Sequence, residues 1–252
     1  MEEVTAGQRP YQIQTHCGDI SYFLRRSRRR RTIEISIGGE TSRVKVSAPT
    51  YTSHNDIQNF IRKKTEWIIE KIKEAEVFQQ TLEARQYAQG EYFLFLGKKH
   101  PIEIVQEGYI RKVLFEEERW KIRVPVFLSS RDLALDIKSQ LVEWYRHQAQ
   151  EILPGRVLHY AGKMSLQPSK IHIRNQKRIW GSCHPQNRNI HLNWRLVLTP
   201  MDVMDYVVVH ELSHLLVPNH SKRFWQEVEK VLPDYPARQK WLKDHRMDLK
   251  IL

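Results

Sequence analysis

Apolar and polar residues alternate along the first fifty positions in the manner of β-strands. Apolar side chains stand at every second position before and after an arginine-rich run, residues 25–31. A Gly38-Gly39 pair then separates two alternating segments, as expected of a hairpin turn. We therefore expect the arginines to extend a strand or to lie at a turn.

A helical period replaces this alternation from about Asp56 to Glu76, where apolar residues recur every three or four positions. Ser53 or Asn55 can cap the first turn, because a side-chain oxygen there accepts a hydrogen bond from a free backbone N–H. Alternation then returns and predicts four further strands, in residues 92–96, 102–105 and 110–128. Residues 1–129 are thus expected to form a small β-rich domain with one helix.

The composition changes after this segment, and the apolar spacing becomes that of a long helix from Asp132 to about Leu153. Pro154 is expected to kink or end this helix, because proline lacks the N–H that continues the hydrogen-bond ladder. Two short strands are predicted next, at residues 171–173 and 189–194.

Another helix is predicted to begin at Thr199. Thr199 can act as the N-cap, Pro200 fits the first helical position, and Asp202 can return the capping bond. The apolar stripe of this helix continues into His210 and His214, so both histidines are expected on its inward face.

This helix carries the chemistry, in His210-Glu211-Leu212-Ser213-His214. Residues four apart project from one face of a helix, so both imidazoles can reach a single zinc ion. Glu211 is displaced around the helix, where its carboxylate can polarise a metal-bound water instead of binding the metal. The HExxH pattern is typical of metal-dependent hydrolases in which a metal-bound water is activated by the glutamate.

A catalytic zinc site needs a third protein ligand and one position left open for water. His220 follows His214 at the spacing used by metzincins, although Val217 stands where their turn has a glycine. The proline and asparagine that precede His220 favour a reversal of the chain. The spacing thus favours His220 over the alternative third ligand, a glutamate of the next helix, Glu227 or Glu229.

With its continuation through Trp225, the motif resembles the YgjP-like metal-dependent hydrolase family, which is related to the SprT-like and other zincin metallopeptidases. Two upstream segments match motifs of that family in the expected order, Trp180-Gly181-Ser182-Cys183 and Leu192-Asn193-Trp194-Arg195-Leu196. The resemblance is close over residues 130–245 and looser before them. Ile179 departs from the family pattern, in which a polar or basic residue is common.

The resemblance implies an α+β fold, with the β-rich domain followed by a zincin-like minimal metallopeptidase domain of helices and a short sheet over residues 130–252. It also implies Zn²⁺ as cofactor, held by His210, His214 and His220, with Glu211 as the base. A zinc-dependent hydrolase that acts on peptides or proteins is therefore the leading interpretation.

Substrate contacts are expected near the metal, from Trp180, Gly181, Ser182, Asn193 and Arg223. In zincins an extended peptide lies along a sheet edge beside the metal, and Gly181 would permit close approach of the backbone. A structural loop with Trp180 packed in the core is the alternative interpretation of this motif. Cys183 offers a further alternative, as a nucleophile or a metal ligand.

The net charge of +12 favours polyanions, and its distribution is uneven. Residues 1–75 carry +5 and residues 150–225 carry +6, whereas the segment between them is neutral. Two alternatives to a peptidase follow: a nucleotide phosphoanhydride hydrolase, or a protein-processing factor that docks on nucleic acid through Arg25–Arg31 and the basic 150–225 segment. Solubility alone is the competing explanation of the charge.

Two cysteines, Cys17 and Cys183, are too few for a disulfide framework and indicate a reducing compartment. The first residues lack the apolar core of a secretory signal. No apolar stretch approaches the roughly 20 residues that a membrane span needs. We therefore expect a cytoplasmic protein that has no membrane partner.

Overall fold

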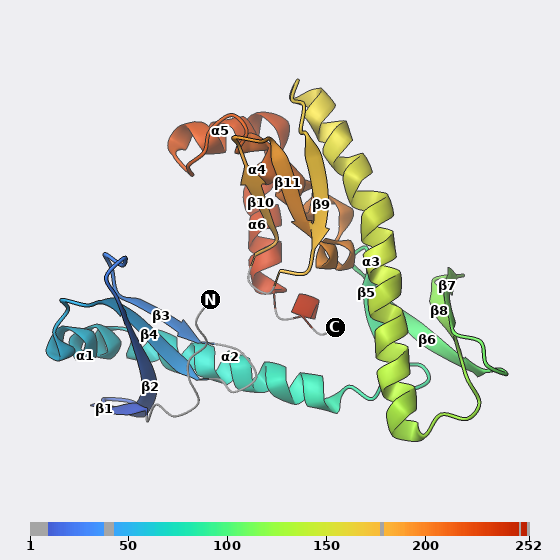
Figure 1. Ribbon diagram of the computed structural model, residues 1–252, viewed down its shortest axis with the longest axis horizontal. Helices are drawn as coiled ribbons and strands as arrows, with labels where there is room; N and C mark the ends of the chain where they lie inside the picture. Colours follow the sequence, from blue (N-terminus) through green and yellow to red (C-terminus); the bar gives the residue numbers. More distant parts are fainter. Residues whose placement is uncertain (1–9, 38–42, 177–178, 247, 251–252) are drawn as a thin grey trace. The chain divides into compact units, whose positions relative to one another are not determined.

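The computed structural model describes residues 10–37, 43–176, 179–246 and 248–250. It has an α+β fold, and the contacts between its residues divide the chain into two compact units, Met1–Arg85 and Gln86–Leu252 (Figure 1). The predicted Gly38-Gly39 turn lies outside the described residues.

The described residues of the first unit form one four-stranded sheet and two helices (Figure 1). Its elements are β1 (Tyr11–Thr15), β2 (Gly18–Ser27), β3 (Glu34–Ile37), β4 (Val44–Pro49), α1 (His54–Lys63) and α2 (Thr65–Ala84). The strand order is β1-β2-β4-β3, with β2 and β4 parallel and the outer pairs antiparallel. Alternate strand residues, such as Val44 and Val46, pack with Ile57 and Ile61 of α1 into a small apolar core.

The arginine run extends β2, as predicted. Arg25 and Arg26 lie in the strand, and the residues after Ser27 turn away from it. Arg26 donates a hydrogen bond to the carbonyl of Thr52 (2.5 Å), and Arg30 forms an ion pair with Glu34 (2.7 Å). Part of the positive charge of this run is therefore engaged within the first unit.

The prediction of a single helix after β4 is wrong, because the chain forms two helices there, α1 and then α2. Ser53 caps α1, and its hydroxyl oxygen accepts a hydrogen bond from the N–H of Asp56 (3.0 Å). The break falls at Lys64, where the hydroxyl of Thr65 donates to the carbonyl of Ile61 (3.3 Å). Such side-chain bonds compete with the helical ladder and bend or interrupt helices.

In the described part of the second unit, two sheets and three shorter α-helices surround the long helix α3 (Ser130–Lys163). The first sheet has the order β5-β6-β8-β7 and comprises β5 (Tyr92–Phe95), β6 (Lys98–Gln106), β7 (Lys112–Glu116) and β8 (Arg119–Val124). The second has the order β10-β11-β9 and comprises β9 (Lys170–Arg174), β10 (Gly181–His184) and β11 (Asn189–Asn193). The remaining elements are η1 (Trp194–Leu198), α4 (Met201–Ser213), α5 (Lys222–Val231), α6 (Tyr235–Asp244) and η2 (Asp248–Lys250).

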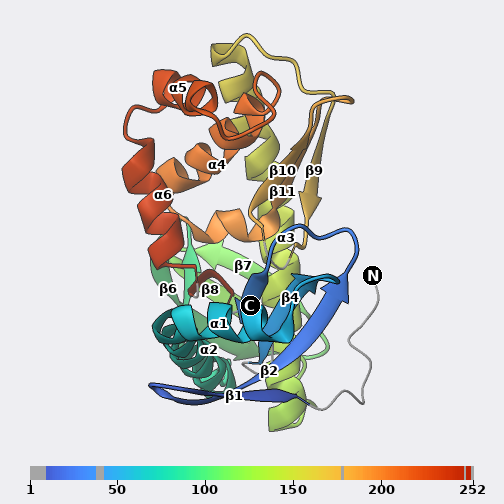
Figure 2. The same ribbon diagram turned by 90° about the vertical axis from the view of Figure 1, so that its left-hand side faces the viewer.

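Helix α4 lies in the middle of this arrangement. Figure 2 shows α4 between the β9–β11 sheet on one side and the helices α5 and α6 on the other. Helix α3 runs beside both sheets (Figure 1). The helix that carries the HExxH motif therefore packs against α3, α5, α6 and β10. None of the described helices is long and apolar enough to cross a membrane.

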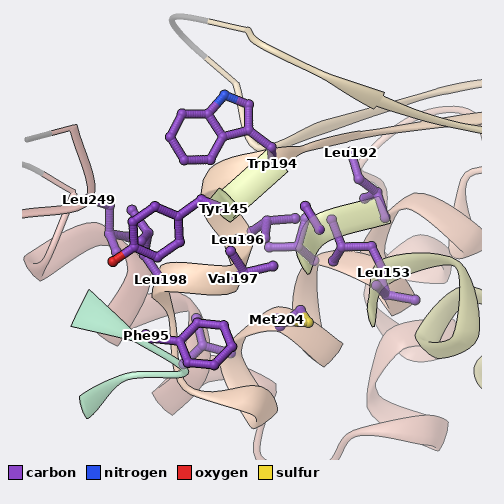
Figure 3. Packing of buried hydrophobic residues seen from close by; sticks show 14 of the residues in the cluster. Phe95, Tyr145, Leu153, Leu192, Trp194, Leu196, Val197, Leu198, Met204 and Leu249 are labelled. Atoms are coloured by element: carbon purple, nitrogen blue, oxygen red, sulfur yellow. The ribbon is translucent and has the colours of Figure 1, made fainter. Parts of the chain in front are cut away.

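The compact units divide between residues 85 and 86, whereas composition placed the domain boundary after residue 129. The reason is a shared core, because the buried residues of β5, β6 and β8 belong to one cluster with those of α3, η1 and α4. Figure 3 shows Phe95 of β5 in this cluster. The backbone N–H of Leu96 also donates to the carbonyl of Val197 in η1 (2.8 Å).

Pro154 does not end α3, which continues to Lys163. The apolar face continues beyond the proline through Val157 and Tyr160, which are 0% and 6% exposed. Burial of these side chains offsets the hydrogen bond that the proline cannot make.

Thr199 does not cap α4 as predicted. Its hydroxyl donates to the carbonyl of Leu196 (2.8 Å), so it closes the end of η1 instead. Helix α4 begins after Pro200 without a side-chain cap.

Candidate metal centre

Three histidines meet where α4 ends and the chain reverses. His210 lies in the last turn of α4, His214 follows the helix directly, and His220 precedes α5. Each offers one ring nitrogen, and these nitrogens all lie within 4.8 Å of one another. Within the described part of the chain, no other group of His, Cys, Asp or Glu side chains converges in this way, so Glu227 and Glu229 lie outside the cluster.

The spacing of the imidazoles suits a tetrahedral cation. The Nε2 atoms of His210 and His220 are 3.0 Å apart, and the three ring centroids are separated by 4.7–5.0 Å. Zinc with Zn–N bonds of about 2.0–2.1 Å holds its ligand nitrogens about 3.3 Å apart. Three imidazoles are a donor set that zinc prefers, and the cluster fits this ion.

The ring of Phe224 packs against the imidazole rings of all three histidines. Its side chain is fully buried, and its ring centroid lies 4.9, 4.5 and 4.8 Å from those of His210, His214 and His220. Trp225 adds a second aromatic contact, 5.8 Å from His210. Both residues belong to α5, so this helix orients the histidines and shields one side of the cluster from water.

Two of the histidines, His210 and His214, are held in the neutral form that binds metal ions. Burial, together with the charges of His214 and His220, lowers the pKa of His210 to about 3. Burial also lowers the pKa of His214. The Nδ1 of His214 lies 3.2 Å from the carbonyl of Val217, which can only accept a hydrogen bond. Nδ1 therefore carries the proton and leaves Nε2 free as a ligand.

Glu211 is buried beside the histidines, with 6% of its surface exposed. Burial raises the pKa of its carboxyl group to about 8. The carboxylate lies against Gly181 of β10, where a Cβ would stand 2.6 Å from Oε1 of Glu211. The sequence predicted close approach of a substrate at Gly181, and the structure shows close approach of the Glu211 side chain.

Strand β10 forms one edge of its sheet, directly beside Glu211. Among the described strands β10 pairs with β11 alone, so no described strand pairs with its other side. Cys183 lies in β10 and is half-buried, and burial, followed by the nearby Glu211, raises the pKa of its thiol to about 12. Such a thiol stays protonated at neutral pH and is a poor nucleophile.

The remaining predicted substrate contacts do not converge on one place in the structure. Trp180 is partly buried against the core cluster, and Ser182 stands opposite His191 on the face of β10 turned away from Glu211. Asn193 is 2% exposed, and its amide group donates to the carbonyls of Gln176 (2.7 Å) and Ile179 (3.1 Å), so it supports the loop that leads into β10. Arg223 is exposed at the start of α5.

An ion pair that the local sequence pattern does not predict holds α4 against α3. Arg156 donates from Nε and Nη2 to the two carboxylate oxygens of Asp205 (2.7 and 2.6 Å), and the hydroxyl of Tyr160 donates to Asp205 as well (2.9 Å). Asp205 lies in an otherwise apolar run of α4 and is 5% exposed. A lone carboxylate at a buried helical position needs a partner, which is the signal that could have revealed this contact.

An aromatic stack beside the histidines is a second feature that the sequence pattern does not predict. Tyr235 of α6 stacks on Trp225 at 5.2 Å and on Tyr206 at 6.5 Å, and Tyr206 lies 5.9 Å from His210. Burial raises the pKa of Tyr206 to about 12, so its phenol is neutral. The stack joins α4, α5 and α6 next to the cluster.

Comparison with known proteins agrees with this geometry. The family model described as a YgjP-like metallopeptidase domain matches residues 31–245. No curated protein matches the chain. Among solved structures, the chain is similar to the crystal structure of the metallopeptidase zymogen abylysin of Pyrococcus abyssi, with 28% identity over 38% of this chain and 92% of that one. The TM-score is 0.34, so this likeness carries no argument about the fold. The family match covers most of the sequence and both compact units, and the chain therefore belongs to the YgjP-like metallopeptidase family.

Proposed function

We propose that this metal-dependent peptidase uses zinc, bound by His210, His214 and His220. The observation that carries the proposal is the convergence of three imidazole nitrogens within 4.8 Å at the end of the HExxH helix. The set contains no carboxylate, which favours zinc over calcium or magnesium, because those ions prefer oxygen ligands.

The three histidines would hold zinc, which when bound would supply an acidified water molecule and a Lewis acid for the carbonyl group of the scissile bond. Glu211 is the proposed catalytic base: a cation held by the histidines would favour the ionised form of this buried carboxyl group, which would then take a proton and return it to the leaving amine. Its side chain is packed against Gly181 and is nearly excluded from solvent, so the carboxylate has little freedom to turn away. The three histidines and Glu211 thus have separate roles, ligation and proton transfer.

We propose that an extended peptide binds along the edge of β10 that does not pair with β11. Edge strands present free backbone N–H and C=O groups, which an added strand can pair with. Gly181 brings this edge next to Glu211, so a paired peptide would pass beside the base and the histidines. Trp180 and Ser182, which flank Gly181, and Arg223 on α5 are the proposed substrate contacts.

The family match favours a peptidase over a phosphoanhydride hydrolase, because the family model is described as a metallopeptidase domain. Docking on nucleic acid gains no specific support, since part of the arginine run is bound within the first unit. We further propose a cytoplasmic location, because Cys17 and Cys183 are both free thiols.

Metal analysis of matched variants tests the assignment. We expect about one zinc per chain in the wild-type protein, and losses of more than about 100-fold in zinc affinity for His214→Ala and His220→Ala. Glu227→Gln and Glu229→Gln are the controls and should keep the metal. Glu211→Gln should keep its zinc and lose peptide hydrolysis by about 10²–10⁴-fold. If Glu227→Gln or Glu229→Gln loses zinc while His220→Ala still binds it, the proposed ligand set is overturned.

A further inference from the structure

Three more histidines form a row across the second sheet, outside the cluster at the end of α4. His172 lies in β9, His191 in β11 and His184 in β10. His172 and His191 are direct partners in the parallel register, and Ser182 of β10 stands opposite His191 on its other side. The ring of His191 lies 4.9 Å from that of His172 and 5.0 Å from that of His184.

The row lies on the face of the sheet turned away from α4. Successive residues of a strand point to opposite faces, and Ile190 and Leu192 of β11 point into the core. Gly181 of β10 likewise faces Glu211, so the alternate residues of the three strands face outward. His184 is exposed, and His172 and His191 are partly exposed. The row is therefore accessible to a solute without passing through the peptidase site.

The two neighbouring ring pairs of the row are spaced like the rings of the first cluster, where the centroids are 4.7–5.0 Å apart, but the ligand atoms of its three histidines do not all lie within 4.8 Å of one another as they do there. In the row, His191 contacts a histidine on each side, so it is the shared member of two adjacent pairs. A cation could bind His191 together with one neighbour, and rotation of the exposed His184 would bring in the third ring. Water would complete the coordination.

The donor set restricts the class of ligand. Neither aspartate nor glutamate occurs in β9, β10 or β11, so hard cations such as Ca²⁺ and Mg²⁺ find no oxygen ligands of the kind they prefer. Imidazoles suit zinc, copper and nickel. Lys170 and Arg174 at the ends of β9 carry permanent positive charge and weaken the binding of any cation, so this site is expected to be weaker than the first.

The ionisation of His191 is compatible with metal binding. Burial lowers the pKa of His191, and the charges of His172, His184 and Arg174 act in the same direction. His191 is therefore neutral near physiological pH, with a ring nitrogen available as a ligand.

We propose that His172, His184 and His191 form a second metal site, for ions such as zinc, copper or nickel, on the outer face of the β9–β11–β10 sheet. A metal ion there would connect the edge strand β10 to the two strands behind it. It would thereby brace the strand whose opposite face contacts Glu211. The site does not depend on the identity of the metal in the first cluster.

Zinc titration of the metal-free full-length chain, near neutral pH and followed by calorimetry, tests the proposal. The wild-type protein should bind two equivalents, the second more weakly. His191→Gln should bind one, and His184→Gln should weaken the second equivalent about tenfold. His147→Gln is the matched control, because His147 is exposed on α3 and should leave both equivalents intact. Retention of the first equivalent reports that each variant is folded.

A double variant, His210→Ala/His214→Ala, isolates the proposed site. This chain should still bind one equivalent of zinc, and addition of His191→Gln should remove it. A second equivalent that persists without His191, or a wild-type chain that binds one equivalent at every zinc concentration, overturns the proposal. If inorganic phosphate, and no metal, perturbs the three imidazole resonances as the pH falls, the row is an anion-binding surface and the proposal is also overturned.

Discussion

At the scale of single residues, the carboxylate of Glu211 occupies the space that a side chain at position 181 would need. Gly181 has no positive φ, so its backbone conformation is open to any residue. The requirement for glycine is therefore one of space, since a Cβ would stand 2.6 Å from Oε1 and 2.7 Å from Cγ of Glu211. The strand thus helps to determine where the proposed base can lie.

Gly181→Ala should displace this carboxylate and leave the metal ligands in place. Misplacement of a reacting group by about 1 Å costs about 10²-fold in rate, and we expect a loss of that size in peptide hydrolysis. Zinc content should stay at the wild-type level. Gly155→Ala in α3 is the matched control, because its added Cβ meets nothing within 4 Å. Equal activity of the two variants would contradict this role of Gly181.

The thiol of Cys183 should resist alkylation in the native protein. Its pKa is raised to about 12, so the reactive thiolate is scarce at neutral pH, whereas Cys17 is exposed. Mass spectrometry after iodoacetamide treatment should show one adduct on the native chain and two on the unfolded chain. Cys17→Ser should remove the native adduct. Rapid native labelling of Cys183 would instead support the nucleophile alternative.

At the scale of elements, the HExxH helix is held by a buried ion pair. Asp205 of α4 accepts three hydrogen bonds from Arg156 and Tyr160 of α3. Its side chain is 7% exposed and that of Arg156 is 29% exposed. Removal of the carboxylate leaves a partly buried guanidinium and a buried phenol without this partner.

Asp205→Ala should therefore lower the free energy of unfolding of the second unit by about 2–4 kcal/mol. Urea unfolding followed by tryptophan fluorescence measures the change, because six of the seven tryptophans lie in that unit. Lys240→Ala provides the comparison, since it breaks a fully formed but exposed ion pair with Asp244 (2.6 Å). That change should cost at most about 0.5 kcal/mol. Similar costs for the two variants would contradict a structural role for Asp205.

Strands and helix starts that depend on local signals were predictable from the sequence. The alternation around the arginine run, the strand pairs after residue 90 and the cap at Ser53 all appear in the structure. Pro154 and Thr199 were misjudged, because tertiary burial carries α3 past the proline and the carbonyl of Leu196 takes the threonine hydroxyl. These outcomes depend on neighbours that the local sequence does not contain.

In the candidate site, too, local features were predictable from the sequence and contacts between distant segments were not. The relation of His210 to His214 follows from helical geometry, and the reversal before His220 was visible in its turn residues. The Phe224 platform and the contact between Gly181 and Glu211 join segments far apart in the chain. Periodicity and spacing within one segment carry no information about such contacts.

At the scale of the whole molecule, the histidine cluster and its supports all lie in the second compact unit. That unit has its own apolar core, formed by α3, α4 and the strands on either side of α3. We therefore expect residues 86–252, produced alone, to fold and to bind zinc as the full chain does. Circular dichroism and zinc analysis check this. A fragment that is unfolded in the presence of zinc would show that the first unit is needed for folding.

The proposed pairing of a peptide with the edge of β10 also bears on which proteins this peptidase could attack. A strand edge of four residues can pair with a chain whose own backbone N–H and C=O groups are free, and in a folded protein nearly all of these groups are already satisfied. Compact native proteins would then be resistant, while frayed ends, nascent segments and heat-damaged loops would be accessible. Discrimination between damaged and intact protein would follow from hydrogen-bonding geometry, without any recognition of a particular side chain.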